Sequence, residues 1–515
     1  MRLTYSLQQS ALHHPERLAT VCGDRMRTYA EVIDRVARLA SGLRAQGAKA
    51  GDRIAILALN SDAHFEAYYA ILWAGCLAVP CNNRWTAAEH AAAFADCEPS
   101  FVLIDDNFVE MLEHLPADLR KRVIALGAGN YAKTSTDRLI ADSGPMQDDS
   151  SDGDAPAAIF YTGGTTGKSK GAVLSHNNLI VNFLATTAVE PYERPCVYLH
   201  VAPMFHLADA TMAFGVTMIA GTHVFVPRFD PAMIVKAIAE HGVNTLVLVP
   251  TMIAMLDQYL REQPHRLTNI RRLTYGASPI STTLMGRTLV LFPNARITQA
   301  YGQTELSPVV TLLSHEHHLP NADGKSRIRS AGRAIPGVEV RVVDQDGSPM
   351  LTGGTGEIVV RGPNVMLGYW RNPELTAQTI VDGWIKTGDA GYLDEDGFLF
   401  LVDRVKDMIV SGGENVYSVE VENALAQHPA VLECAVIGVP DPQWGERVHA
   451  VLRFRPNTSA TEDELTAHCA KLIAGYKRPR SFEFRAAPLP LSGAGKILKT
   501  ELRKPFWKDA ARAIS

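Results

Sequence analysis

Residues 1–130 alternate apolar, strand-like runs with capped helices, and this order restricts the fold more than any other feature. Thr28 with Glu31, and Thr86 with Glu89, form capping boxes in which each pair satisfies free amides at a helix start. Apolar runs that are typical of buried strands lie between these helices, at 53–57, 77–79 and 101–104. Such alternation predicts parallel sheets covered by helices.

Three further blocks continue the chain. The pattern predicts a second alternating block with strands at 197–201, 224–226, 245–249 and 273–275 and helices at 231–241 and 251–260. Short β-branched runs with glycine turns predict a β-rich subdomain at 338–360. The last hundred residues favour a small α+β domain with helices at 419–427 and after Thr461, and strands at 431–439 and 448–454. The expected class is therefore α/β, with more than one domain for 515 residues.

The bulk composition excludes several classes of protein. A net charge of −5, with 50 basic and 55 acidic residues, argues against a nucleic-acid partner. Seven cysteines are scattered without a C-x-x-C pair, which favours free thiols in a reducing compartment and no zinc cluster. The N-terminus has no apolar core of signal-peptide length, and the stretch 211–227 is too interrupted to span a bilayer. We therefore expect a cytoplasmic location and no transmembrane segment.

The stretch 161–171 is the strongest chemical signal. It follows an apolar run at 157–160 and combines glycines, threonines, a serine and two lysines. Glycines expose backbone amides in tight turns, hydroxyls add donors, and lysines add positive charge, so the stretch predicts a phosphate-binding loop. Its glycine spacing misses the Walker A pattern by one position, because Thr162 stands where that pattern has its first glycine. A flexible surface loop is the alternative interpretation.

The segment 162–170 resembles the signature loop of the adenylate-forming enzymes, the family of acyl- and aryl-CoA synthetases, peptide-synthetase adenylation domains and luciferases. The resemblance extends over nearly the whole chain and implies a large N-terminal domain at 1–402, a hinge at 403–406 and a mobile C-terminal domain at 407–515. It also implies that the loop binds the phosphates of ATP, through Thr162, Gly163, Gly164, Thr165, Thr166, Gly167, Lys168 and Lys170.

A second motif covers 301–305 and follows a strand expected at 296–299. The resemblance implies that Tyr301 stacks on adenine, with Gly302 and Gln303 beside the nucleotide. Thr304 would contact the α-phosphate or the acyl carboxylate, and Glu305 would bind Mg2+, which prefers oxygen ligands. Gln303 departs from the family, where methionine is commonest, and this difference concerns the acyl pocket. The alternative is a strand-end turn with a solvent-facing glutamate.

Two further motifs point to the nucleoside. Gly276, Ala277 and Ser278 resemble the family's adenine-binding turn, although Gly-Ala-x-Pro also forms ordinary turns. Asp389, within 383–391, resembles the aspartate that accepts hydrogen bonds from both ribose hydroxyls. A plain turn aspartate is the alternative for that position.

The segment 403–416 is similar to the family's hinge. The resemblance implies a ribose or phosphate contact from Arg404 and a pivot at Lys406. It also implies that Ser411, Gly412 and Gly413 line the pantetheine tunnel of CoA, where glycines leave room for a narrow chain. The alternative is a charged linker that ends in a glycine turn.

Lys496, in the segment 491–499, matches the family's catalytic lysine, which bridges the acyl carboxylate and the α-phosphate. His206 resembles the residue that gates the tunnel at the acid and thiol sites, with a packed core histidine as the alternative. The apolar stretch 207–215 would wall the acyl pocket. It offers no cation for a second carboxylate, which disfavours dicarboxylates.

Together these features indicate an ATP-dependent acid–CoA ligase that uses Mg2+ and forms acyl-AMP and pyrophosphate, then acyl-CoA and AMP. The expected acid is a medium- or long-chain fatty acid. Alternatives are an aryl acid of the benzoate or cinnamate type, or transfer of the acyl group to a carrier protein instead of CoA. A luciferase-like oxygenase and an inactive binding module are rival classes. The small-molecule partners are the acid, ATP and CoA, and the sequence leaves the oligomeric state open.

Overall fold

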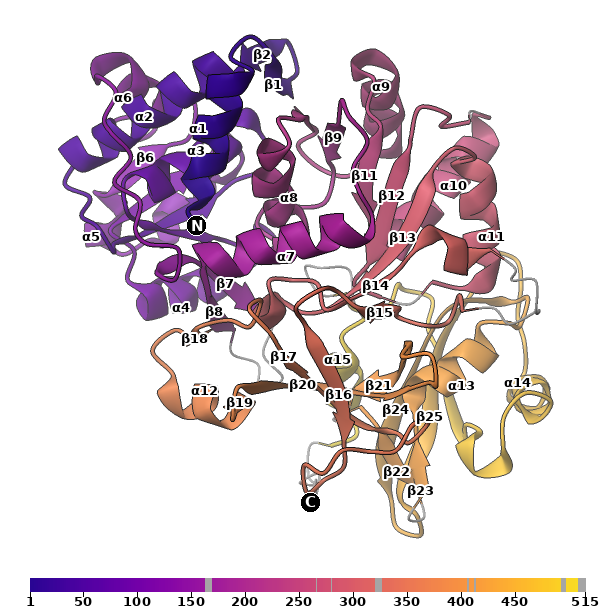
Figure 1. Cartoon of the computed structure of the whole chain (residues 1–515). Coiled ribbons are helices and arrows are strands. Elements are labelled where there is room, and N and C mark those ends of the chain that lie inside the picture. The colour runs from indigo at the N-terminus through magenta and orange to yellow at the C-terminus, as the bar shows by residue number, and fades with distance from the viewer. Residues whose placement is uncertain are drawn as a thin grey trace. The chain divides into compact units, whose positions relative to one another are not determined.

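The computed structural model describes residues 1–162, 169–264, 266–278, 280–319, 327–404, 407–411, 414–491 and 497–507, with backbone only at Thr282, Arg404, Glu414 and Asn415 (Figure 1). The chain forms two compact units, each described by itself below. The first unit contains Met1–Glu339 and Val360–Ile385, and the second contains Val340–Val359 and Lys386–Ser515. The predicted boundary at 403–406 concerns domain movement, which a division into compact units does not test, so that boundary stays a prediction.

One sheet of the first unit has seven strands in the order β18-β8-β7-β4-β3-β5-β6. The segment from β7 to β6 is parallel, while β7-β8 and β8-β18 are antiparallel. The strands are β3 (Arg53–Leu57), β4 (Leu77–Pro80), β5 (Phe101–Ile104), β6 (Val123–Ala125), β7 (Pro156–Thr162), β8 (Lys170–Ser175) and β18 (Gly368–Tyr369). The helices of this region are α1 (Leu3–His13), α2 (Tyr29–Ala45), α3 (Asp62–Trp73), α4 (Ala87–Cys97), the 3-10 helix η1 (Asp106–His114), α5 (Ala117–Arg120), α6 (Thr136–Asp142) and α12 (Pro373–Thr379).

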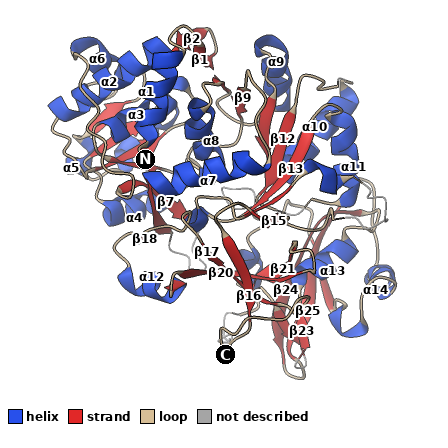
Figure 2. Ribbon diagram, in the orientation of Figure 1, coloured by secondary structure: helices blue, strands red, loops and turns tan. Residues whose placement is uncertain are grey.

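The other sheet of the first unit has nine strands in the order β15-β14-β13-β12-β11-β9-β10-β1-β2. Its central run from β1 to β13 is parallel, and Figure 2 shows α10 and α11 beside β12 and β13. The strands are β1 (Leu18–Cys22), β2 (Arg25–Thr28), β9 (Val197–His200), β10 (Thr222–Phe225), β11 (Thr245–Leu248), β12 (Arg272–Gly276), β13 (Arg296–Tyr301), β14 (Thr311–Leu313) and β15 (Arg333–Ala334). The helices are α7 (His176–Val189), α8 (Leu207–Met218), α9 (Pro231–His241), α10 (Pro250–Glu262), α11 (Thr282–Leu291), η2 (Thr304–Leu306) and η3 (His315–His318).

The chain from β16 onward is rich in antiparallel pairs. One five-stranded sheet joins β16 (Glu339–Val343), β17 (Gly356–Arg361), β20 (Trp384–Leu393), β19 (Ile380–Val381) and β21 (Leu399–Arg404). The second five-stranded sheet joins β22 (Ile409–Ser411), β23 (Glu414–Val416), β24 (Val431–Asp441), β25 (Gly445–Phe454) and β26 (Ser481–Phe484). Its helices are α13 (Ser418–Leu425), α14 (Glu462–Ala470), η4 (Gly475–Lys477) and α15 (Lys499–Arg503).

The α/β class and the predicted capped helices are confirmed. Thr28 and Thr86 start α2 and α4 through complete capping boxes, and Thr461 does the same for α14. Helix α1 was not predicted from the sequence. The helix is held by the segment before β7, because the Thr4 hydroxyl and the Gln8 amide both donate to Asp148 in that segment. Within the described residues, no helix combines the length and apolar character needed to cross a membrane.

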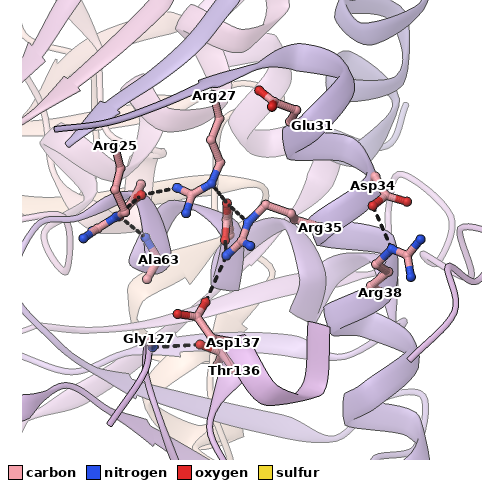
Figure 3. Close-up of polar contacts among 12 residues, drawn as sticks. Arg25, Arg27, Glu31, Asp34, Arg35, Arg38, Ala63, Gly127, Thr136 and Asp137 are labelled. Atoms are coloured by element: carbon pink, nitrogen blue, oxygen red, sulfur yellow. Dashed lines mark hydrogen bonds and ion pairs between the residues drawn. The ribbon is translucent and has the colours of Figure 1, made fainter. Parts of the chain in front are cut away.

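An ion-pair network ties β2, α2, α3 and α6 together (Figure 3). Arg35 on α2 donates through Nε and Nη2 to Glu66 on α3, at 2.8 and 3.0 Å, and through Nη2 to Asp137 on α6 at 3.0 Å. Arg25 binds Asp62 with two hydrogen bonds of 2.9 and 2.6 Å. The Glu66 side chain is only 2% exposed, and burial raises its pKa, although Arg35 lowers it in part.

We expect Arg35→Met to lower the free energy of unfolding by about 3–5 kcal/mol, because it leaves the Glu66 carboxylate buried with its main partner removed. The loss should be larger at pH 8 than at pH 5, since protonation of Glu66 removes the uncompensated charge. Denaturant unfolding at the two pH values measures both effects.

Arg38→Met is the matched control, because Arg38 lies on the same helix and pairs with the exposed Asp34 (Figure 3), while it also donates to the Ser143 carbonyl at 2.9 Å. That i,i+4 pair contributes only about 0.3–0.5 kcal/mol. Equal losses in the two variants would show that the Glu66 contact is not the source of the stability.

Candidate active site

The predicted phosphate loop spans the turn of a β-hairpin. Thr162 at the end of β7 pairs with Lys170 at the start of β8, and Tyr161 pairs with Gly171. The hairpin therefore brings the two ends of the loop together. The loop residues Gly163, Gly164, Thr165, Thr166, Gly167 and Lys168 lie outside the described residues.

Glu305 receives hydroxyl donors from two segments that are far apart in the sequence. Thr162 Oγ1 donates to Glu305 Oε1 at 3.3 Å, and Tyr369 Oη donates to the same oxygen at 3.0 Å. The backbone of Glu305 is also fixed, because its carbonyl accepts from Met366 N at 2.9 Å. Both hydroxyls therefore bind the same carboxylate oxygen, Oε1. The structure thus joins Thr162 and Glu305, which the sequence assigned to one site.

Tyr369 is a member of this cluster that the sequence did not predict. It lies in β18, which pairs with β8, and Lys170 Nζ lies 5.4 Å from the centroid of its ring. Burial raises the pKa of Tyr369, and the charge of Glu305 raises it further, so the hydroxyl keeps its proton and remains a donor. Lys170 is accordingly held beside the loop by a cation–π contact.

Two buried asparagines fix the turn that follows Glu305. The Asn182 amide donates to the carbonyls of Leu306 and Val309 at 3.4 and 2.6 Å, and its oxygen accepts from Val309 N at 3.2 Å. Asn364 donates to the same two carbonyls at 2.9 and 3.2 Å. Neither asparagine was predicted. A buried asparagine within the apolar face of α7 was the only local signal for Asn182.

The turn at 276–278 and the 301–305 motif meet at the carboxyl edge of the nine-stranded sheet. Gly276, the last residue of β12, pairs with Ala300 in β13, and a Cβ at Gly276 would lie 2.4 Å from the Ala300 carbonyl oxygen. Ala277 follows in the left-handed region, with φ of +67°. Tyr301 ends β13 and is buried. Carboxyl ends of parallel strands are where ligands bind in open α/β sheets.

The remaining residues of the two motifs come immediately after the ends of β12 and β13. Ser278 lies in the bend after β12 and is partly exposed. Thr304 begins the 3-10 turn η2 that carries Glu305, and Gln303 precedes it as the N-cap residue. Gly302 lies between Tyr301 and this turn, in close contact with the Pro308 backbone. The structure therefore collects the whole 301–305 motif at one strand end.

His206 is the N-cap residue of α8, and its Nδ1 accepts from Ala208 N at 3.2 Å. The segment before it is held by Asn60, which donates to the Ala202 carbonyl and accepts from Met204 N, both at 2.8 Å. The Tyr68 hydroxyl donates to the Met204 carbonyl at 2.6 Å. His206 thus stands at the end of a firmly anchored loop.

The stretch after His206 is less apolar inside than its sequence suggested. Asp209 is fully buried and lies 2.7 Å from both Tyr198 Oη and His200 Nδ1. His200 Nε2 lies 2.9 Å from His223 Nδ1, and His223 Nε2 lies 3.0 Å from the Thr217 hydroxyl. This buried chain of polar groups fixes α8 to β9 and β10, so Asp209 has its partners inside the core.

In the second unit, Asp389 is buried in β20 and pairs in register with Arg404 in β21. The backbone N–H of Asp389 donates to Thr387 Oγ1 at 3.1 Å. Ser411 ends β22, and its hydroxyl is buried with no hydrogen-bond partner among the described residues. The predicted pivot Lys406, the tunnel residues Gly412 and Gly413, and the catalytic Lys496 lie outside the described residues, as does the side chain of Arg404.

Two family models match the chain. The model described as AMP-binding enzyme matches residues 7–370, and the model described as AMP-binding enzyme C-terminal domain matches residues 420–496. The first match contains the cluster of Thr162, Lys170, Glu305 and Tyr369. The second match ends at Lys496.

Several characterised proteins are similar along almost their full length. A feruloyl-CoA synthase of Amycolatopsis is 39% identical, with 96% of each chain covered. A fatty acid–[acyl-carrier-protein] ligase of Streptomyces coeruleorubidus is 36% identical, with 98% of this chain and 96% of that protein covered. The o-succinylbenzoate CoA synthetase of Bacillus subtilis, solved with ATP and a magnesium ion, superimposes with a TM-score of 0.84 at 31% identity, covering 96% of this chain and 98% of that one.

Proposed function

Because the chain belongs to the AMP-binding enzyme family and is an acid–CoA ligase within it, we propose that it joins a phenylpropenoic acid of the ferulate type to coenzyme A, using ATP. The acid carboxylate attacks the α-phosphorus of ATP, which forms acyl-AMP and releases pyrophosphate. The CoA thiol then loses its proton and attacks the acyl carbon, which releases AMP. The observation that carries the substrate class is the 39% identity to a feruloyl-CoA synthase over 96% of both chains.

Glu305 suits a magnesium ion in this proposal. Mg2+ at nucleotide sites is commonly held by one or two carboxylates together with substrate phosphates, so a single glutamate is sufficient. Thr162 and Tyr369 bind Oε1 and orient the carboxylate, and in this proposal Oε2 would bind the ion. When bound, the ion neutralises charge on the phosphates of ATP. A relative of this family with ATP and Mg2+ bound is consistent with this proposal.

The other roles expected from the sequence remain part of the proposal. In the adenylation step Lys496 and Lys170 balance charge on the α-phosphate and the leaving pyrophosphate, and Tyr301 stacks on adenine. Asp389 and Arg404 bind the ribose, the turn at 276–278 lines the adenine pocket, and His206 gates the acyl tunnel. The C-terminal domain turns at Lys406, so that Ser411, Gly412 and Gly413 meet CoA. A cytoplasmic location, where ATP and CoA are both available, belongs to the same proposal.

Helix α8 carries the stretch that was expected to wall the acyl pocket, and it packs closely against α7. Gly215 on α8 has no side chain where the Phe183 ring of α7 lies, since a Cβ there would come within 2.0 Å of that ring. Phe183 in turn stacks on Tyr192, with ring centroids 5.4 Å apart. The two helices are therefore in close contact at this point, with Gly215 directly beside the Phe183 ring. Fatty acids, with CoA or a carrier protein as acceptor, remain the second candidate because of the 36% identity to a fatty acid–[acyl-carrier-protein] ligase.

Pyrophosphate release with ATP and Mg2+ across a panel of acids tests the proposal, with and without CoA. The panel runs from acetate to palmitate and includes benzoate, ferulate, other cinnamates and malonate. We expect the highest kcat/KM with ferulate-type acids and turnover that requires CoA. An optimum at palmitate would replace the aryl acid with a fatty acid, and turnover independent of CoA would favour a carrier-protein acceptor.

Removal of the Tyr369 hydroxyl tests the role of Glu305. We expect Tyr369→Phe to raise the Mg2+ concentration for half-maximal pyrophosphate release about 10-fold, because groups that orient a metal-binding carboxylate affect metal affinity by about 10–100-fold. The rate at saturating Mg2+ should change much less. A Mg2+ titration at saturating ATP and acid measures the two quantities separately.

Tyr259→Phe is the control, since the Tyr259 hydroxyl only contacts Gln263 on an exposed turn of α10. An unchanged Mg2+ dependence in Tyr369→Phe would mean that this hydroxyl does not orient a metal-binding carboxylate.

A further inference from the structure

The segment that carries Lys496 is clamped where it joins the rest of the second unit. Leu491 and Ile497, on its two sides, form an antiparallel bridge. Leu498 N also donates to the Pro490 carbonyl at 2.8 Å. Ile497 packs against the apolar cluster of the β24–β25 sheet. The base of the segment is therefore fixed on both sides.

Lys499 follows this base and turns its side chain into the unit. Its Nζ lies 2.7 Å from Glu422 Oε1 on α13 and donates to the Ser418 hydroxyl. Glu422 Oε1 also accepts from Val436 N at 2.7 Å, which fixes the carboxylate to β24. The Lys499 side chain is 13% exposed. Burial lowers the pKa of Lys499, but Glu422, Asp403 and Asp407 together raise it above its ordinary value, so the ammonium group stays charged.

The same cluster reaches both sides of the predicted hinge. The Asp403 carboxylate accepts from Ser418 N, at the first residue of α13, where the N-cap residue Tyr417 provides no side-chain cap. On the other side, Arg503 Nη1 donates to Asp407 Oδ1 at 2.8 Å. In α15, Arg503 thus pairs directly with Asp407, and Lys499 is linked to Asp403 through Ser418.

We propose that Lys499 is a positioning residue for the adenylation step, because it ties the base of the Lys496 segment to α13 and to the carboxylates at the hinge. This inference rests on the proposed function, which places Lys496 at the reacting phosphate. Lys499 lies only three residues after Lys496. A displacement of about 1 Å in a catalytic group can lower a rate about 10²-fold, so a fixed anchor at this distance bears directly on catalysis.

The competing explanation is that the Lys499–Glu422 pair only stabilises the second unit. Breaking a buried ion pair is generally destabilising, so a loss of activity alone would not separate the two explanations. The two explanations predict different effects on the two half-reactions, because thioester formation from supplied acyl-AMP does not need Lys496 at the phosphate. A purely structural role lowers both half-reactions together with the folded fraction.

The experiment compares Lys499→Met, Lys499→Arg and the control Lys504→Met in the full chain. Lys504 lies just after α15 and pairs with Glu501 on an exposed face. We expect Lys499→Met to slow acid-dependent pyrophosphate exchange about 30- to 100-fold, in the range that misplacement of a catalytic group produces. Thioester formation from supplied acyl-AMP should stay within about threefold once corrected for the folded fraction, since it bypasses that step. Lys499→Arg, which keeps the charge, should recover most of the exchange rate.

A double variant, Glu422→Gln with Lys499→Met, tests whether misfolding alone explains the loss. It removes both buried charges and keeps a side-chain oxygen that accepts from Val436 N. We expect this double variant to fold and still to show the selective loss of pyrophosphate exchange. Parallel loss of both half-reactions, or no loss of exchange, would overturn the proposal.

Hydrogen exchange provides a readout that does not depend on any acid being turned over. The Leu498 amide, which donates to Pro490, should exchange faster in Lys499→Met than in the wild type or in Lys504→Met. Unchanged hydrogen exchange of the Leu498 amide in Lys499→Met would refute the anchoring itself. The wild type could instead show no activity with any acid while the Leu498 amide still exchanges hydrogen faster in Lys499→Met. That outcome would refute the proposed function but not the anchoring role of Lys499.

Discussion

Replacement of Lys496 by alanine is expected to slow adenylate formation by about 10²–10³-fold, the effect of removing one preorganised group from developing charge. The carboxylate and the α-phosphate are both negative before they react, so a cation between them lowers the free energy of the transition state more than that of the separated reactants. Pyrophosphate exchange with a saturating acid measures this step in isolation.

Thioester formation from supplied acyl-AMP should stay within about threefold in the same variant, because the acid is already activated and the lost interaction belongs to the first transition state. Lys504→Ala serves as the matched control, since it removes an exposed lysine of the same C-terminal region. Equal loss of both half-reactions would contradict an alternating role for the C-terminal domain. A normal rate of pyrophosphate exchange in Lys496→Ala would show that Lys496 is not a catalytic residue.

Local sequence signals predicted the helix starts well, because the interactions that define a helix start join residues only a few positions apart. The capping boxes that start α2, α4 and α14 each join residues three apart, so the sequence contains the whole interaction. The phosphate loop could be predicted for the same reason, since its glycines and hydroxyls are contiguous, and it stays a prediction.

Contacts between distant residues could not be predicted in this way. Tyr369 lies 64 positions from Glu305, and Asn182 lies 127 positions from Val309, so only the folded sheet brings these partners together. Asp209 shows the same limit in the core. Its neighbours in the sequence indicate an apolar wall, whereas its partners His200 and Tyr198 come from the adjacent strand β9.

The substrate is the least predictable feature for a related physical reason. The residues expected to bind phosphate, metal and nucleoside lie in short motifs, whereas the stretch expected to wall the acyl pocket, 207–215, consists mostly of ordinary packing residues. The contact of Phe183 with Gly215 illustrates this, because neither residue type signals a substrate in the sequence. The acid is therefore inferred from relatives, and an activity panel decides it.

Gly302→Ala is expected to lower the rate of adenylation about 10²-fold, because it displaces the groups on both sides of it. A Cβ at this position would lie 2.0 Å from the Pro308 carbonyl oxygen and 3.0 Å from Val310 N. These are backbone atoms, and Asn182 and Asn364 fix the 306–309 turn through its carbonyls, so the turn cannot move away. The strain must instead shift Tyr301, which precedes Gly302, and the segment Gln303–Glu305 that follows it.

Gly286→Ala is the matched control for this substitution. Gly286 lies within α11, and among the described residues no atom beyond its chain neighbours and its own helix backbone lies within 4 Å of the Cβ that alanine would add. Alanine in a helix interior is more stable than glycine by about 0.5–1 kcal/mol, so the control should unfold at a slightly higher temperature and keep its rate. Gly302→Ala should lose about 1–3 kcal/mol of stability from overpacking, and its rate is compared at equal folded fraction. A normal rate in that variant would mean that the turn yields, and that the close contact with Pro308 does not hold Glu305 in place.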